Sequence, residues 1–170
     1  MNYRELGNTG LKVSEIGMGC EGFVADNGKH VRELIDLAQE LGINCIDLYT
    51  SNPEARSSLG EALRGRRNEF ILQAHLCTIW KNGQYKRTRN IKEVKEGFED
   101  LLKRLETDFI EIGMIHYVDS VEDWNTVKEG PVMQYAKELK KKGTIGHIGL
   151  SSHNPEVALE AVKSGMIEVL

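Results

Sequence analysis

Residues 90–116, NIKEVKEGFEDLLKRLETDFIEIGMIH, decide the fold class of this chain. In the first part, apolar residues recur at the spacing of an amphipathic helix: Ile91, Val94, Phe98, Leu101, Leu102 and Leu105. The second part, DFIEIGMIH, is a short and mostly apolar run that is typical of a buried strand. A helix followed directly by such a strand is the repeating unit of a parallel sheet wound by helices.

The same alternation extends in both directions along the chain. Strands are expected in INCIDLY, EFILQAHLC and TIGHIGLS, and the closing letters MIEVL begin another. Helices are expected in KHVRELIDLAQELG, PEARSSLGEALRG, VMQYAKELKKKG and NPEVALEAVKSG. The segments TIWKNGQYKRTRN and YVDSVEDWNTVKEG are expected to be loops.

The chain opens with YRELGNTGLKVSEIGMG, in which two short extended runs flank Asn-Thr-Gly. This pattern predicts a β-hairpin, and residues 15–19 after it predict the first strand of the sheet. About six parallel strands after a hairpin indicate an α/β fold, either a doubly wound sheet or part of a (β/α)8 TIM barrel.

Composition narrows the class of protein. The 170 residues suit one domain, with 40% hydrophobic residues to form a core. A net charge of -4 does not point to nucleic acid as a partner. No apolar run approaches the ~18 residues that span a membrane, and the first residues lack the order of a signal peptide, so we expect a cytoplasmic protein. The cysteines form no C-x-x-C pair and fit reduced thiols.

Residues 17–22, GMGCEG, fit the G-x-G-x-x-G template of a dinucleotide-binding turn. In such a turn the helix begins inside the motif, so that its N-terminus meets the pyrophosphate. Here FVADNG separates the glycines from the next helix. The glycines therefore predict the end of the first strand and its loop, with room beside a reaction site that Cys20 is expected to face.

Several of these segments together resemble the aldo/keto reductase family, over the whole chain. YRELGNTGLKVSEIGMG is similar to the family's opening hairpin and first barrel strand, and GINCIDLY with LGEALRG is similar to its second unit. DFIEIGMIH resembles the strand that bears the catalytic histidine, and KKGTIGHIGLSSHNP resembles the fifth strand and its cofactor-contacting end. The resemblance implies a (β/α)8 barrel that reduces aldehydes or ketones with NADP(H), or oxidises alcohols in the reverse direction.

Such barrels need about 250 residues, so the chain resembles roughly the first two-thirds of one. We expect residues 1–170 to form one truncated barrel domain, which is a product of a longer protein or is completed by a second copy. Open barrel edges predict self-association. A branch of the family with a C-terminal ferredoxin-like extension looks similar in this region, which implies 4Fe-4S clusters in a part that would follow Leu170.

The resemblance also implies four catalytic positions. In the family, a tyrosine gives the proton, a lysine lowers the pKa of that tyrosine, an aspartate pairs with the lysine, and a histidine orients the carbonyl. Asp47 matches the aspartate and His116 matches the histidine. The tyrosine position falls on Asn52 or Pro53, and the lysine position falls on His75, so these two members of the tetrad are not in place.

Other residues are candidates for the missing proton donor. Tyr49 lies two residues after Asp47, so both point the same way on a strand. His75 or His116 would also suit this role, because the pKa of a free imidazole is ~6.5. A nearby Asp47 carboxylate would keep such a ring protonated. The expected catalytic residues are therefore Asp47, His116, His75 and Tyr49.

Two other functions remain open. Asp47, His75, Cys77 and His116 could converge on a metal ion in a TIM-barrel hydrolase, with His75 and Cys77 on one strand face. The two lost catalytic positions also fit a non-catalytic reductase scaffold that is kept for binding or regulation. A reductase of this type needs no metal.

The expected binding residues follow the strand ends. In the family, a serine and the residue after it hold the nicotinamide carboxamide, which implies Ser151 and Ser152 as cofactor contacts, with Gly19 beside them. The expected wall of the pocket for a small carbonyl substrate consists of Trp80, Trp124, Tyr117 and Cys20. The basic run within residues 81–89 is expected to attract an anionic substrate or cofactor.

Overall fold

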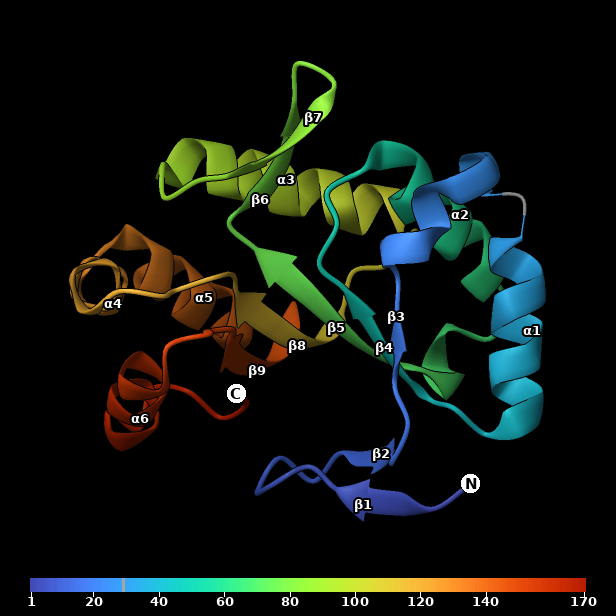
Figure 1. Ribbon diagram of the computed structural model, residues 1–170, viewed down its shortest axis with the longest axis horizontal. Helices are drawn as coiled ribbons and strands as arrows, with labels where there is room; N and C mark the ends of the chain where they lie inside the picture. Colours follow the sequence, from blue (N-terminus) through green and yellow to red (C-terminus); the bar gives the residue numbers. More distant parts are fainter. Residues whose placement is uncertain (29) are drawn as a thin grey trace.

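The chain folds around one parallel sheet. In a computed structural model, which describes residues 1–28 and 30–170 (the backbone alone for residues 25–28), five strands are hydrogen-bonded in the order β3-β4-β5-β8-β9 (Figure 1). These strands are β3 (Met18–Gly19), β4 (Cys45–Leu48), β5 (Ile71–Leu76), β8 (Ile110–Ile115) and β9 (Ile145–Leu150). Where the sequence predicts a sixth strand, Val169 forms an isolated parallel bridge to Gly149.

The strand order distinguishes between the two expected architectures. Neighbouring strands follow one another along the chain without a reversal, whereas a doubly wound sheet reverses its order at a switch point. Because parallel crossovers are right-handed, an unreversed order places the connecting helices on one face of the sheet. The fold is therefore the expected partial barrel, with β3 and β9 as its open edges (Figure 1).

Helices cover the outer face of this sheet (Figure 1). They are α1 (Val31–Leu41), α2 (Pro53–Leu63), α3 (Ile91–Arg104), α4 (Val121–Glu129), α5 (Pro131–Lys142) and α6 (Pro155–Lys163). Two short 3₁₀ helices, η1 (Glu21–Gly28) and η2 (Arg67–Glu69), precede α1 and β5 in the chain. The sequence predicts α1 from Lys29, which lies outside the described residues. Within the part of the chain that the structure describes, none of these helices has the length and apolar character needed to cross a membrane.

The helix ends follow capping rules. The side chains of Asn52, Asn90 and Asn154 accept backbone hydrogen bonds at the first turns of α2, α3 and α6. Gly42 and Gly143 end α1 and α5 in the left-handed conformation that favours glycine. These local signals explain why the predicted helices form at the expected places.

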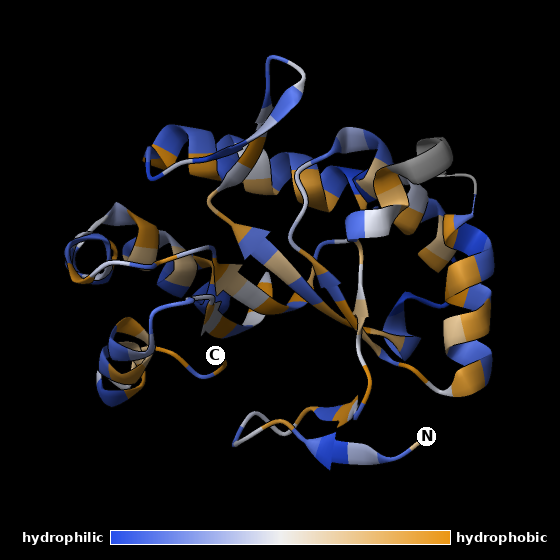
Figure 2. Ribbon diagram, viewed as in Figure 1, coloured by the Kyte–Doolittle hydropathy of each residue, from blue (hydrophilic) through white to orange (hydrophobic). Residues whose placement is uncertain are grey.

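Apolar side chains lie on both faces of the sheet. The main core lies between the strands and the sheet-facing sides of the helices. The outer sides of the helices are mostly polar, except on α1, which carries a large apolar surface (Figure 2). A smaller cluster around Ile112 and Met114 packs against Leu6 and Leu11 of the N-terminal hairpin. This hairpin consists of β1 (Tyr3–Glu5) and β2 (Lys12–Ser14), which pair antiparallel as predicted. The hairpin lies at the end of the sheet opposite to the carboxyl ends of the strands (Figure 1).

A second hairpin forms where a loop is predicted. Here β6 (Thr78–Lys81) and β7 (Gln84–Arg87) pair antiparallel. Asn82 and Gly83 connect them with positive φ angles of 54° and 75°. Asn-Gly is the favoured sequence for such a two-residue turn, so the signal for this hairpin is local. The hairpin projects beyond the carboxyl ends of the strands (Figure 1).

The second predicted loop contains α4. Ser120 caps this helix by accepting a hydrogen bond from the Asp123 backbone N–H at 3.1 Å. Ser-x-x-Asp before an apolar residue is a helix-start signal of the capping-box type. Helical structure turns Trp124 into the core, where its side chain is buried.

Candidate active site

A pocket of about 560 Å³ lies at the carboxyl ends of β4, β5, β8 and β9. Its lining residues are Asp47, Tyr49, Thr50, His75, Tyr85, His116, Tyr117, Ser151 and His153. In barrels of this kind, functional side chains lie at the carboxyl ends of the strands, because the loops that carry them follow these ends and are fixed in position by the sheet. All of the expected catalytic residues line this pocket.

Asp47, His75 and His116 form a line of hydrogen bonds across three neighbouring strands. Nε2 of His75 lies 2.9 Å from Oδ1 of Asp47, and Nδ1 of His75 lies 2.7 Å from Nδ1 of His116. Gln73 also donates to Asp47 Oδ1, at 3.0 Å. The strand order explains the line, because β5 lies between β4 and β8 and places His75 between the other two residues. Both histidines are buried.

The two ends of this line carry different charges. Burial opposes ionisation of Asp47, but the hydrogen bond and charge of His75 outweigh burial and lower the pKa of Asp47. Burial lowers the pKa of His116 to about 4, and repulsion from His75 and Arg89 adds to this effect. At neutral pH, Asp47 is therefore a carboxylate and His116 is a neutral imidazole.

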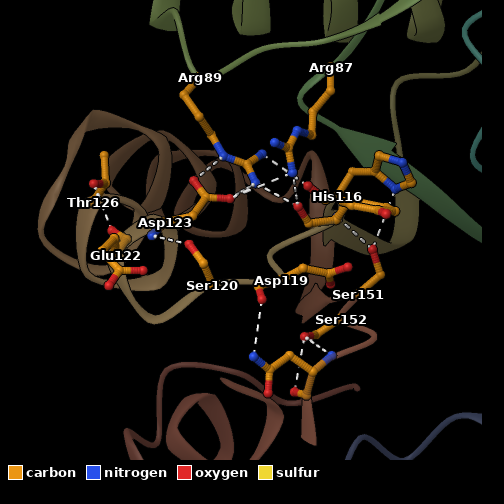
Figure 3. A network of polar contacts seen from close by, with 12 residues as sticks. Arg87, Arg89, His116, Asp119, Ser120, Glu122, Asp123, Thr126, Ser151 and Ser152 are labelled. Atoms are coloured by element: carbon orange, nitrogen blue, oxygen red, sulfur yellow. Dashed lines mark hydrogen bonds and ion pairs between the residues drawn. The ribbon is translucent and has the colours of Figure 1, made fainter. Parts of the chain in front are cut away.

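Two arginines hold the backbone that follows β8 (Figure 3). Arg89 donates to the carbonyl oxygens of His116 and Tyr117, at 2.9 and 3.0 Å, and Arg87 donates to that of Tyr117 at 2.7 Å. Arg89 also forms a bidentate ion pair with Asp123 of α4, at 2.9 and 2.7 Å. Tyr117 needs such support, because its φ of 56° is unusual for a residue with a side chain.

The basic residues of the second hairpin thus have partners inside the protein. Lys81 and Lys86 both form ion pairs with Glu93, at 2.8 and 2.9 Å. Arg87 and Arg89 bind the backbone beside His116 (Figure 3). These contacts give the basic run a structural role, and its attraction of an anionic ligand stays a prediction.

Tyr49 lies in the pocket with Asp47, as their spacing predicts. Its ring stacks on that of His116, with centroids 5.9 Å apart and an interplanar angle of 12°. Burial raises the pKa of Tyr49, and a hydrogen bond to Glu21 adds to this effect. The hydroxyl is then a weaker acid than a free tyrosine. Of the two residues on which the family's tyrosine position is expected to fall, Asn52 caps α2 with its side chain and Pro53 begins that helix.

Ser151 is better placed than Ser152 to contact a cofactor. Oγ of Ser151 lines the pocket, accepts the Tyr117 backbone N–H at 2.8 Å and lies 3.4 Å from Nδ1 of His116. Its hydroxyl hydrogen can turn toward a ligand in the pocket. Oγ of Ser152 instead donates to the Asn154 carbonyl and accepts the Asn154 N–H, within the turn before α6.

Three residues that were expected to form the substrate wall lie elsewhere. Trp124 is 2% exposed and belongs to the main core. Cys20 is also in this core, because side chains alternate at the end of β3, and Gly19 rather than Cys20 pairs beside Asp47. A Cβ atom at Gly19 would meet no neighbour within 4 Å, so this position is open. Trp80 lines a different pocket, between α2 and α3.

Three lining residues were not among the predicted site residues. Tyr85 comes from β7, so its position depends on the hairpin that was expected to be a loop. Thr50 and His153 follow the carboxyl ends of β4 and β9, which is the signal that could have found them. His153 is held by Asp119, which accepts from its backbone N–H at 2.7 Å and contacts its Nδ1 at 3.1 Å.

The residues considered for a metal site are not arranged to hold an ion. Both ring nitrogens of His75 are engaged, by Asp47 and by His116. Cys77 is buried beside Arg89, and its φ of 71° ends the strand alternation that would have placed it with His75. Among the described residues, no group of three or more histidine, cysteine, aspartate or glutamate side chains is arranged to hold a metal ion.

Known proteins share this sequence pattern. A sequence model of the aldo/keto reductase family matches residues 15–170. The chain is 32% identical to the uncharacterized oxidoreductase YqkF of Bacillus subtilis, over 98% of this chain and 54% of that protein. It is 30% identical to the aldo-keto reductase YhdN of the same organism, over 92% of this chain and 48% of that protein.

The fold is shared as well. The holo form of aldo-keto reductase AKR11C1 from Bacillus halodurans superposes with a TM-score of 0.83 at 32% identity, over 96% of this chain and 54% of that one. The chain thus spans about half the length of these relatives. By its sequence and by its partial barrel, this chain belongs to the aldo/keto reductase family.

Proposed function

We propose that the protein is an NAD(P)H-dependent oxidoreductase that reduces an aldehyde or ketone, or oxidises the alcohol in the reverse direction. The observation that carries this proposal is the line of hydrogen bonds from Asp47 through the buried His75 to the buried His116, which ends in a pocket. Carbonyl reduction needs an acid beside the oxygen on which negative charge develops. His116 lies at the pocket end of the line and suits this role.

Ser151 supports a nicotinamide cofactor at this pocket. When bound, NAD(P)H supplies the hydride for the carbonyl carbon. The Ser151 oxygen accepts the Tyr117 N–H, which leaves its hydroxyl hydrogen able to bind the carboxamide of the cofactor. Because the chain spans about half the length of its relatives, we expect the cofactor phosphates to contact a part of the whole barrel beyond these residues.

The walls of the pocket favour a small carbonyl substrate with an apolar body. The rings of Tyr49, Tyr85 and Tyr117 surround His116, with centroids 5.9, 6.1 and 5.8 Å from its own. Aromatic walls bury apolar atoms, and a few polar groups orient the reacting bond. An aromatic aldehyde or ketone is therefore the class of substrate to test first.

Turnover by the full-length protein tests this function. We expect oxidation of NADPH when aromatic aldehydes are added, measured by nicotinamide absorbance. His116→Asn should lower kcat by about 10²-fold or more, because it removes the group beside the carbonyl oxygen. His30→Gln is the matched control, since the His30 side chain is 63% exposed before α1, and its kcat should equal that of the wild type.

Cofactor binding without turnover of any aldehyde, ketone or alcohol would overturn this proposal in favour of a non-catalytic reductase scaffold. The same preparation tests the resemblance to the iron–sulfur branch. Visible absorption and iron content of the full-length protein would reveal 4Fe-4S clusters, and an electron acceptor would then join the substrate panel.

A further inference from the structure

We propose that His75 and His116 form a two-imidazole proton relay, in which His75 stores the proton at Nδ1 and His116 delivers one from Nε2 to the substrate oxygen. This inference rests on the proposed function, because it assigns the source of the proton for carbonyl reduction. His116 is then the catalytic residue, and His75 is a positioning residue that acts through it.

The contact between the two Nδ1 atoms restricts where hydrogens can lie. At 2.7 Å the contact needs one hydrogen between the rings, since two bare nitrogens would repel and two N–H groups would collide. On the other side of His75, the Asp47 carboxylate only accepts, so Nε2 of His75 carries a hydrogen. The variable positions are therefore the hydrogen between the rings and the hydrogen on Nε2 of His116.

When the pair carries one positive charge, that charge can lie on either ring. The surroundings favour His75, because the Asp47 carboxylate contacts it at 2.9 Å. Burial and neighbouring positive charge hold the pKa of His116 at about 4, so this ring is neutral. With its Nδ1 accepting from His75, His116 carries its own hydrogen on Nε2. No hydrogen bond to Nε2 of His116 occurs in the described part of the chain, so this N–H can meet a ligand.

The relay moves one positive charge out of the pair. As the carbonyl carbon accepts the hydride, the π electrons of the C=O bond move to oxygen, which takes the hydrogen from Nε2 of His116. The hydrogen on Nδ1 of His75 moves to Nδ1 of His116, so no imidazole anion forms. The carbonyl has gained a hydride and a proton, the cofactor has lost the hydride, and His75 has lost its charge. A proton from water that binds Nε2 of His116 reverses the movement and reloads His75.

His116 is the exit for this proton, because neither ring nitrogen of His75 is open to a ligand. His75 is 4% exposed, and both of its nitrogens are engaged. The titratable groups that surround the pair or line its pocket, together with Ser151, are Asp47, Tyr49, Cys77, Tyr85, Arg87, Arg89, Tyr117 and His153. Asp47 is the carboxylate of this set and contacts His75, whereas the arginines bind the backbone beside His116.

The relay predicts that His116 changes tautomer when the pair loses its charge at high pH. The hydrogen leaves from Nε2, and the hydrogen between the rings then belongs to Nδ1 of His116. Nitrogen NMR of the histidine rings, in the full-length protein without cofactor, distinguishes these forms. We expect Nε2–H while the pair is charged and Nδ1–H after the pair has lost its charge. One unchanged tautomer across the titration would overturn the relay, whatever the activity of the enzyme.

His75→Gln separates proton storage from support of the pocket. The glutamine amide can hydrogen-bond to Asp47 and His116, but it stores no transferable proton. We expect kcat to fall by about 10²-fold and to lose its decline at high pH, while cofactor affinity is unchanged. His30→Gln is the control and should keep the pH profile of the wild type.

A His75→Gln enzyme that keeps both the wild-type kcat and its pH profile would show that His75 only supports the pocket, and would refute the relay. Failure of the proposed function looks different. In that case the wild type turns over no carbonyl substrate, while the tautomer of His116 still decides whether the relay exists.

Discussion

His116 links the chemistry of the pocket to the stability of the fold. Burial lowers its pKa to about 4 in the folded chain, whereas a histidine in an unfolded chain has a pKa of about 6.5. As the pH falls through this interval, the unfolded chain binds the proton first. The contribution of neutral His116 to the free energy of unfolding is therefore fully present above the upper pKa and is lost toward the lower one.

We expect the free energy of unfolding to fall by on the order of 1–3 kcal/mol as the pH is lowered through this interval. His116→Asn should remove most of the decrease, because its side chain does not titrate. Denaturant unfolding at a series of pH values measures both slopes. Lys92→Met, a change on the exposed side of α3, should keep the wild-type slope, and an equally steep slope in His116→Asn would contradict the assignment.

At the scale of elements, α2 and the end of α3 approach so closely that Gly60 has no room for a side chain. A Cβ atom there would lie 2.3 Å from the Arg104 carbonyl oxygen and 2.9 Å from Cα of Leu105. Both are backbone atoms, so relief requires the two helices to separate. This contact fixes α2, which begins directly after the loop that carries Thr50 into the pocket.

Gly60→Ala should therefore destabilise the protein by on the order of 2 kcal/mol, the typical cost of overpacking. On helix propensity alone, the same change would stabilise α2 by about 1 kcal/mol, so the sign of the effect is informative. Glu61→Ala, at the next and exposed position of α2, is the matched control. Denaturant midpoints measure both variants, and a Gly60→Ala midpoint at or above that of the wild type would refute the close contact.

At the scale of the whole molecule, α1 has a second apolar side. One side of the helix packs in the main core. On another side of α1, the side chains of Leu34, Leu37 and Leu41 are 43%, 49% and 53% exposed. Their spacing along the helix places them in one stripe. Exposed apolar stripes of this kind mark contacts with another surface. The stripe lies on the helix that follows β3, an open edge of the sheet.

We propose that a second copy covers this stripe when the 170-residue chain is produced alone. Light scattering after size-exclusion chromatography should show a mass that rises with concentration. Leu37→Lys combined with Leu41→Lys should move the chain toward the monomer. Arg32→Glu, at an exposed position of the same helix that faces away from the stripe, should not. A wild-type chain that stays monomeric at every concentration would exclude self-association.

Local patterns in the sequence were enough to place most elements and the strand ends that carry Asp47, His75 and His116. Periodicity and helix caps involve near neighbours in the chain, so they can be read without the fold. The same holds for the two elements that were expected to be loops. Asn82-Gly83 and the Ser120 cap are local signals for β6–β7 and α4.

Packing between distant segments set the rest of the site. Cys77 and Tyr117 follow their strands with positive φ angles, which local sequence patterns do not encode. As a result, Tyr117 lines the pocket and Cys77 does not. The contact between His75 and His116 depends on the pairing of β5 with β8, and on Arg89 holding the backbone that follows. Side chains that meet across strands are brought together by register and burial, and a linear pattern contains neither.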